Sequence, residues 1–140
     1  MEPTNDTPLP VRSTKHSAGY DFFAPCDLHI FPNQFTNIDT NIKFTDKDTI
    51  LTHGICDKWV MLLFPRSSLG FKYGLRFANT VCVIDQDYRD TIKVSMTADI
   101  FCKIKQNERF MQGIFIPYGT LYDEISPITK RTGGIGSTNP

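Results

Sequence analysis

The side chains that could do chemistry fall in five short polar stretches, four of which contain glycine. These are SAGYDFFA (17–24), PRSSLG (65–70), NTVCVIDQDYRD (79–90), ERFMQG (108–113) and RTGGIGST (131–138). The fifth stretch combines unhindered backbone N–H donors, three hydroxyls and a cation, which suits phosphate oxygens. The second sets hydroxyls beside a guanidinium, again suited to phosphate, and Asp21 and Asp85 could serve Mg²⁺ directly or through water. Together the five stretches predict a phosphate site.

Taken singly, each stretch has a simpler structural explanation. Asp21 can cap a turn, and Gln112 can face solvent. Arg66 and Arg89 can pair with acids, and the glycines at 133, 134 and 136 can belong to a flexible tail. The fifth stretch is not a Walker loop, because no Gly-Lys-Ser/Thr follows its glycines. It is the combination that favours phosphate.

The elements that must position these side chains are short strands. Residues 92–104 alternate apolar and polar side chains almost perfectly, which predicts one long half-buried strand. Further strand candidates end at Pro, Asn or Asp and cover residues 28–31, 35–44, 59–64 and 110–116. Residues 67–76 show a weak helical period but are glycine-rich, so no helix is assigned there. Many short strands separated by turn signals predict an all-β barrel or sandwich.

Composition narrows the class of protein. The 140 residues fit one domain, and 15 acids balance 15 bases, which argues against a nucleic-acid partner. The longest apolar stretch, Trp59–Pro65, is far short of the ~20 residues of a membrane span. The polar, proline-rich start is not a secretory signal, so a cytoplasmic location is expected.

The cysteines and histidines show no site of their own. Cys26, Cys56, Cys82 and Cys102 are widely spaced, so we expect buried free thiols in a reducing cytosol rather than a zinc site or disulfides. The three histidines lack metal-ligand spacing.

In their order and spacing the five stretches resemble the motifs of the trimeric dUTPase family, from about Ser17 to Thr138. The resemblance implies a jelly-roll-like β-barrel over residues 1–130. It also implies a glycine-rich C-terminal arm, residues 131–140, that closes over an active site. The expected assembly is a homotrimer with active sites shared between subunits. The expected activity is Mg²⁺-dependent hydrolysis of dUTP to dUMP and pyrophosphate, which keeps uracil out of DNA and supplies dUMP for dTMP synthesis.

The same resemblance assigns roles on the nucleoside side. Asp85 would be the general base, activating a water for in-line attack on the α-phosphorus. Asn79 to Tyr88 would form a β-hairpin whose backbone, at Val83 and Ile84, and whose Asn79 side chain bind uracil. Tyr88 would lie against the deoxyribose and exclude a 2′-hydroxyl.

On the phosphate side, Ser67 would act near the α,β bridge, with Ser68 beside it. Arg66 and Gln112 would fix neighbouring phosphates or the catalytic shell, so Arg66 and Ser67 count as catalytic with Asp85. Asp21 would contact Mg²⁺ through water. The arm would touch the nucleotide through Arg131, Gly134, Ile135, Gly136 and Ser137, with Arg131 preferred over Lys130 at the γ-phosphate because its planar fork binds bidentately.

The chain departs from the family pattern at three further positions. Ile135 stands where phenylalanine is usual, and a lost stacking contact of roughly 0.5–1.5 kcal/mol predicts weaker affinity or looser closure of the arm. Cys82 replaces a usual glycine, so we expect a backbone approach there that differs from the family's. Asn107 replaces another glycine, in a position that a left-handed turn residue tolerates.

Two alternative functions stay open at this point. A dCTP deaminase shares the fold and an RSS element, although its hairpin and glutamate differ. A non-catalytic nucleotide-sensing or protein-binding module is the other alternative. The polar insert at residues 46–59 could serve a partner or be an ordinary connection, which we favour.

Overall fold

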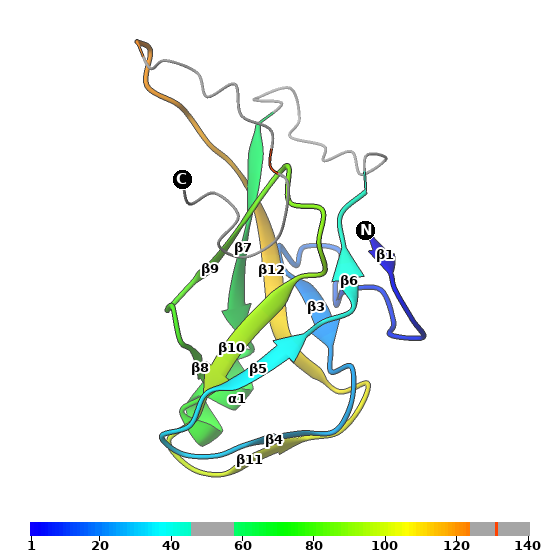
Figure 1. Ribbon diagram of the computed structural model, residues 1–140, viewed down its shortest axis with the longest axis vertical. Coiled ribbons are helices and arrows are strands. Elements are labelled where there is room, and N and C mark those ends of the chain that lie inside the picture. The colour runs from blue at the N-terminus through cyan, green and yellow to red at the C-terminus, as the bar shows by residue number, and fades with distance from the viewer. Residues whose placement is uncertain (46–57, 124–130, 132–140) are drawn as a thin grey trace.

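The computed structural model describes residues 1–45, 58–123 and 131, and these residues form an all-β fold with one short helix (Figure 1). The elements in chain order are β1 (Glu2–Pro3), β2 (Val11–Arg12), β3 (Tyr20–Phe23), β4 (Leu28–Ile30), β5 (Thr36–Asp39), β6 (Ile42–Lys43), β7 (Trp59–Pro65), α1 (Ser67–Tyr73), β8 (Arg76–Phe77), β9 (Cys82–Asp85), β10 (Lys93–Thr97), β11 (Cys102–Ile104) and β12 (Arg109–Pro117). The predicted all-β, jelly-roll-like class is confirmed. No closed barrel forms among these elements, since they belong to four separate hydrogen-bonded sheets.

The largest sheet has the order β2-β3-β12-β7-β9, with every pair antiparallel. The long strand β12 lies at its centre, between β3 and β7, as Figure 1 shows. In this register Gln112 of β12 pairs with Asp21 on one side and with Phe64 on the other. Residues about 50 and 90 positions away in the sequence therefore meet at one place.

Three smaller sheets complete the fold. They are the three-stranded β5-β10-β8 and the ribbons β4-β11 and β1-β6. In Figure 1, α1 lies at the lower end of the molecule, near β8 and the β4-β11 ribbon. The described residues contain no helix long and apolar enough to cross a membrane.

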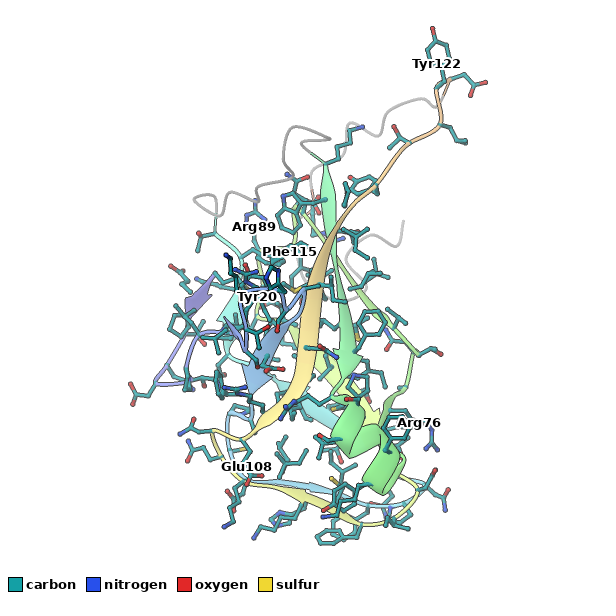
Figure 2. The ribbon with its side chains drawn as sticks, turned by 180° about the vertical axis from the view of Figure 1, so that it is seen from behind. Tyr20, Arg76, Arg89, Glu108, Phe115 and Tyr122 are labelled. Atoms are coloured by element: carbon teal, nitrogen blue, oxygen red, sulfur yellow. The ribbon has the colours of Figure 1, made fainter. Side chains whose placement is uncertain are left out.

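Alternation along the strands builds the core. Trp59, Met61 and Leu63 of β7 are buried, and the residues between them are half-buried. The Trp59 ring meets the Phe115 ring edge-on at 5.1 Å, and Tyr20 contacts Phe115 in the same way at 5.7 Å (Figure 2). Burying a large apolar side chain stabilises a fold by about 1.5–3 kcal/mol, so β7 and β12 form a rigid frame.

The expected single strand over residues 92–104 is wrong, because it is two strands in different sheets. β10 pairs with β5 and β8, whereas β11 pairs with β4. Between them the backbone N–H groups of Asp99 and Ile100 donate to the Tyr73 carbonyl instead of a neighbouring strand. Ile100, expected on the buried face, is 56% exposed.

Two other local expectations also change. The run at 35–44 is divided into β5 and β6, because Asn41 has a left-handed φ of 59°. Residues 67–73, left without an assignment, form α1, which Gly74 ends in a left-handed conformation at φ 63°. This helix begins directly after β7, so it fixes where Ser67 lies.

The cysteine expectation is confirmed for two of the three described thiols. All three are free, and Cys82 and Cys102 are buried, but Cys26 is exposed. Cys26 lies in the connection between β3 and β4, where a small side chain can face solvent. Cys56 lies outside the described residues.

Candidate active site

A polar pocket of about 350 Å³ lies where the first, second and fourth stretches meet. Its lining residues are Ser13, Ser17, Ala18, Gly19, Asp21, Arg66, Ser67, Gln112 and Ile114. The pairing of β12 with both β3 and β7 brings Gln112, Asp21 and the end of β7 together. Asp21, Arg66, Ser67 and Gln112 are thus gathered as the sequence predicted.

One buried carboxylate organises the charges of this pocket. Asp21 is 7% exposed, and its Oδ1 lies 3.6 Å from Arg66 Nε. Its Oδ2 accepts from Arg109 Nη1 at 3.2 Å and from Ser13 Oγ at 2.7 Å. Arg109 Nη1 also donates to Ser13 Oγ at 2.7 Å. Two guanidiniums share a single carboxylate, so the cluster keeps one positive charge in excess, which suits an anionic ligand.

Glycine at position 19 gives the Gln112 amide its room. A Cβ on Gly19 would come within 2.5 Å of Gln112 Oε1. The absent side chain therefore allows the amide to pack against the turn and to line the pocket. The sequence alternative in which Gln112 faces solvent is not the arrangement observed.

The side chains of this pocket suit a metal ion whose ligands are mainly water and substrate phosphate oxygens. The described residues include no group of three His, Cys, Asp or Glu side chains able to hold an ion. Mg²⁺ keeps several waters and commonly binds through substrate phosphates and one or two carboxylates. Because the contact of Asp21 Oδ1 with Arg66 is longer than a hydrogen bond, this oxygen retains the capacity to accept from a metal-bound water.

A second cluster surrounds Asp85 at the end of β9. The Arg131 guanidinium pairs with Asp85 through Nη2 and with Asp87 through Nε at 3.1 Å. It also lies over the ring of Tyr88, 5.5 Å from the centroid. The Arg131 side chain is 12% exposed, whereas those of Asp85 and Asp87 are 54% and 62% exposed. Asp87 is thus part of a charge pair with Arg131.

Tyr88 is buried, and its hydroxyl donates to the Thr91 carbonyl at 3.0 Å. Burial raises the pKa of the Tyr88 phenol, and the nearby carboxylate of Asp90 adds to the rise. The phenol is therefore neutral at ordinary pH. One face of its ring is covered by Arg131, so a sugar could reach that face only after the guanidinium moves.

The two clusters lie at opposite ends of β7. Asp85 pairs in register with Val60, near the start of the strand, whereas Arg66 follows its last residue, Pro65. Six residue steps at about 3.3 Å each separate the two positions by about 20 Å. One chain by itself does not place the Asp85 carboxylate against the Ser67 pocket.

The segment between β8 and β9 is a tight turn. β8 pairs with β10 and β9 with β7, so the expected hairpin over residues 79–88 is not formed by strands paired with each other. The reason is that β10 and β7 supply the pairing partners of these two strands. Within the turn, Val81 N–H donates to the Asn79 carbonyl at 2.6 Å, and Thr80 has a left-handed φ of 65°. The Cys82 thiol donates to Asn79 Oδ1 across this turn at 3.2 Å.

The remaining predicted residues are distributed as follows. Val83 is exposed, Ile84 is buried in β9, and Ser68 is exposed in the first turn of α1 outside the pocket lining. Lys130, Gly134, Ile135, Gly136 and Ser137 lie outside the described residues. Sequence reasoning missed Ser13 and Arg109; Arg109 stood within the fourth stretch, whereas Ser13 carried no signal of its own.

Comparison with known proteins gives a consistent picture. A family model described as dUTPase matches residues 5–139. The deoxyuridine 5′-triphosphate nucleotidohydrolase of Lactococcus lactis is 34% identical over 93% of this chain and 87% of its own length. That of Desulfitobacterium hafniense is 36% identical, over 93% and 86% respectively.

Solved structures agree with these relatives. The dUTPase of Streptococcus mutans superposes with a TM-score of 0.66 at 29% identity, over 85% of this chain and 92% of that one. A dUTPase of Staphylococcus bacteriophage 80alpha, solved with dUpNHpp, gives a TM-score of 0.71 at 20% identity, over 99% and 96%. That of phage phi11 of S. aureus, which coordinates a structural Mg(II) ion, gives 0.72 at 17% identity, over 92% and 95%. The two phage proteins support the fold alone.

Proposed function

The chain belongs to the dUTPase family, and from this premise we propose that it hydrolyses dUTP to dUMP and pyrophosphate with Mg²⁺ and an aspartate general base. The observation that carries the proposal is the Asp21 cluster: the Arg66 guanidinium, serine hydroxyls and the Gln112 amide line one pocket, and Arg109 pairs with the Asp21 carboxylate. This positively charged pocket suits a triphosphate because that group carries several negative charges.

On the phosphate side, the pocket residues bind the triphosphate and stabilise the leaving group. Arg66 binds phosphate oxygens and is held in place by Asp21. Ser67, at the start of α1, donates near the α,β bridge, where negative charge develops on the leaving group. Gln112 orients its neighbours from the β12 side. Mg²⁺, held by the substrate phosphates and contacted by Asp21 through water, would neutralise charge on the triphosphate.

On the nucleoside side, Asp85 accepts a proton from a water directed at the α-phosphorus. The backbone of β9, paired along β7, fixes this carboxylate. Tyr88 presents its ring to the deoxyribose and excludes a 2′-hydroxyl. Asn79 and the backbone at Val83 and Ile84 bind uracil.

These two halves must come from different subunits of a homotrimer. The separation of about 20 Å along β7 supports this, because no small side-chain movement closes it. The arm, residues 131–140, completes the site, with Arg131 on the γ-phosphate and Gly134 to Ser137 over the nucleotide. Sedimentation at micromolar concentration should give three times the monomer mass of 15.9 kDa. A monomer that hydrolyses dUTP would refute shared sites.

The cell compartment is also part of the proposal. Three described cysteines are free thiols, which fits a reducing cytoplasm. There the product dUMP would feed dTMP synthesis, and uracil would be kept out of DNA.

The direct test measures pyrophosphate release from dUTP, UTP, dTTP and dCTP, each with and without Mg²⁺. Release from dUTP alone, dependent on Mg²⁺, is expected. Ammonia release from dCTP would instead show a deaminase. Tight dUTP binding without any product would show a nucleotide-sensing module.

A further inference from the structure

Cys82 and Asn79 face each other across the turn that connects β8 with β9. The Cys82 thiol donates to Asn79 Oδ1 at 3.2 Å, and Cys82 is 6% exposed whereas Asn79 is exposed. The left-handed Thr80 and the hydrogen bond from Val81 N–H to the Asn79 carbonyl fold the chain back so that positions 79 and 82 meet. A β-branched residue in this conformation is unusual and is held only by surrounding contacts.

This hydrogen bond decides which end of the Asn79 amide remains for a ligand. An asparagine side chain carries an acceptor oxygen and a donor NH₂ group, which are interchanged by a simple flip. With Oδ1 engaged by the thiol, the group left to face a ligand is Nδ2, a donor. A donor at this position suits a carbonyl oxygen and opposes an amino group.

Uracil and cytosine differ in the hydrogen-bonding group at the 4-position of the ring. Uracil carries a carbonyl at its 4-position and cytosine an amino group, so the first accepts a hydrogen bond where the second donates one. A fixed donor on the protein rejects cytosine because two donors meet and neither is satisfied. Asn79 without a fixed orientation could flip to present Oδ1 and accept from cytosine.

We propose that Cys82 is a specificity-determining positioning residue, which fixes the Asn79 amide with its donor toward the base and so favours uracil over cytosine. This inference rests on the proposed function, in which Asn79 contacts the base. It assigns a role to a side chain that stands where the family usually has none.

The thiol must keep its proton to act in this way. Burial raises the pKa of Cys82 and outweighs the opposing effect of the hydrogen bond to Asn79. The side chain is therefore a neutral donor at ordinary pH. A thiolate at this position would accept from Nδ2 instead and reverse the amide.

The test compares the ratio of kcat/KM for dUTP to that for dCTP in the purified full-length protein. Cys82→Ala should lower this ratio by about three- to tenfold, the range that corresponds to the loss of one neutral hydrogen bond. Cys82→Ser keeps a donor and should stay within about twofold of the parent protein. Cys102→Ala is the matched control, because it removes a thiol that is also buried but lies in β11.

Several results would overturn the inference. An unchanged ratio in Cys82→Ala, an equal fall in Cys82→Ser, or an equal fall in Cys102→Ala would each do so. If Cys82→Ala does not fold, Asn79→Asp gives a second measurement: it places only acceptors at the base, so the ratio should fall even with the thiol intact. An unchanged ratio in Asn79→Asp overturns the inference as well.

The parent protein separates this failure from that of the proposed function. If it releases no pyrophosphate from dUTP, the proposed function fails. If it hydrolyses dUTP and the Cys82 variants keep the same dUTP-to-dCTP ratio of kcat/KM as the parent protein, only the role of Cys82 fails.

Discussion

The guanidinium of Arg131 is paired with the carboxylate of Asp85, the group proposed to activate water. The same guanidinium binds Asp87 and covers the ring of Tyr88. The first residue of the arm therefore occupies the place that the proposed function gives to the deoxyribose and the attacking water. Under that proposal, a nucleotide has to displace Arg131 before Asp85 and Tyr88 become available.

Asp87→Asn should make this displacement easier, because it removes one of the two ion pairs of Arg131. Exposed pairs contribute about 0.2–1 kcal/mol, so KM for dUTP should fall by up to about fivefold while kcat changes little. Steady-state kinetics at low salt measures this. Asp99→Asn, which breaks the exposed pair with Arg76 near α1, is the control and should leave KM unchanged. A rise in KM with Asp87→Asn would show that Asp87 helps to bind the nucleotide.

Asp85→Asn should abolish pyrophosphate release while dUTP binding remains. The amide keeps the size of the side chain but cannot accept the proton, and loss of a general base costs about 10²- to 10⁴-fold in rate. Single-turnover assays and calorimetric titration with dUTP separate chemistry from binding. Asp27→Asn, an exposed acid of the β3–β4 connection, should behave as the parent protein. Hydrolysis at the parental rate by Asp85→Asn would remove the assigned role.

Asp21→Asn should weaken both the fold and the use of Mg²⁺. The change leaves Arg66 and Arg109 without the negative charge between them. Because both guanidiniums are partly exposed, we expect a loss of about 1–3 kcal/mol in the free energy of unfolding rather than the larger cost of a fully buried pair. Urea denaturation measures this loss. Titration of activity should show a higher Mg²⁺ requirement, and an unchanged requirement would argue against the water-mediated contact.

Gly74→Ala should destabilise the fold without a direct effect on the site. Gly74 has a left-handed φ of 63°, and a Cβ there would lie 2.1 Å from Asp99 Oδ2. A strained conformation costs about 1–3 kcal/mol, which should lower the urea midpoint. Gly119→Ala is the matched control, since a Cβ at that position meets nothing within 4 Å. Equal midpoints in the two variants would contradict the role of Gly74 as the end of α1.

Asp90→Asn should flatten the dependence of stability on pH in acid. The hydrogen bond from Lys93, followed by that from the Thr91 backbone, lowers the pKa of Asp90 below its ordinary 3.8. A carboxyl whose pKa is lowered in the folded state stabilises the fold at a pH above its ordinary pKa. This stability is lost as the pH falls through the folded-state pKa. Urea midpoints between pH 5 and pH 2.5 should therefore fall more steeply for the parent protein. Parallel curves would contradict the contribution.

The sequence by itself determined the class of fold and the residue types that line the polar pocket. Short apolar runs that end at proline predicted β7 and β12 within a residue or two, because both the run and its end are local features of the sequence. The five stretches marked Asp21, Arg66, Ser67 and Gln112, and β-pairing brings all four together. The charge and hydrogen-bonding groups of these side chains follow from the residue type alone, so they can be read from the sequence.

Only the tertiary structure decided how these parts relate. The strand expected at 92–104 is divided because Asp99 and Ile100 donate to Tyr73, a contact that no local pattern encodes. Ser13 and Arg109 join the Asp21 cluster through a hydrogen bond spanning 96 positions of sequence. The distance between Asp85 and Ser67 depends on the register of β9 against β7. Register and long-range contacts arise from packing between distant segments, so they become visible only once the chain is folded.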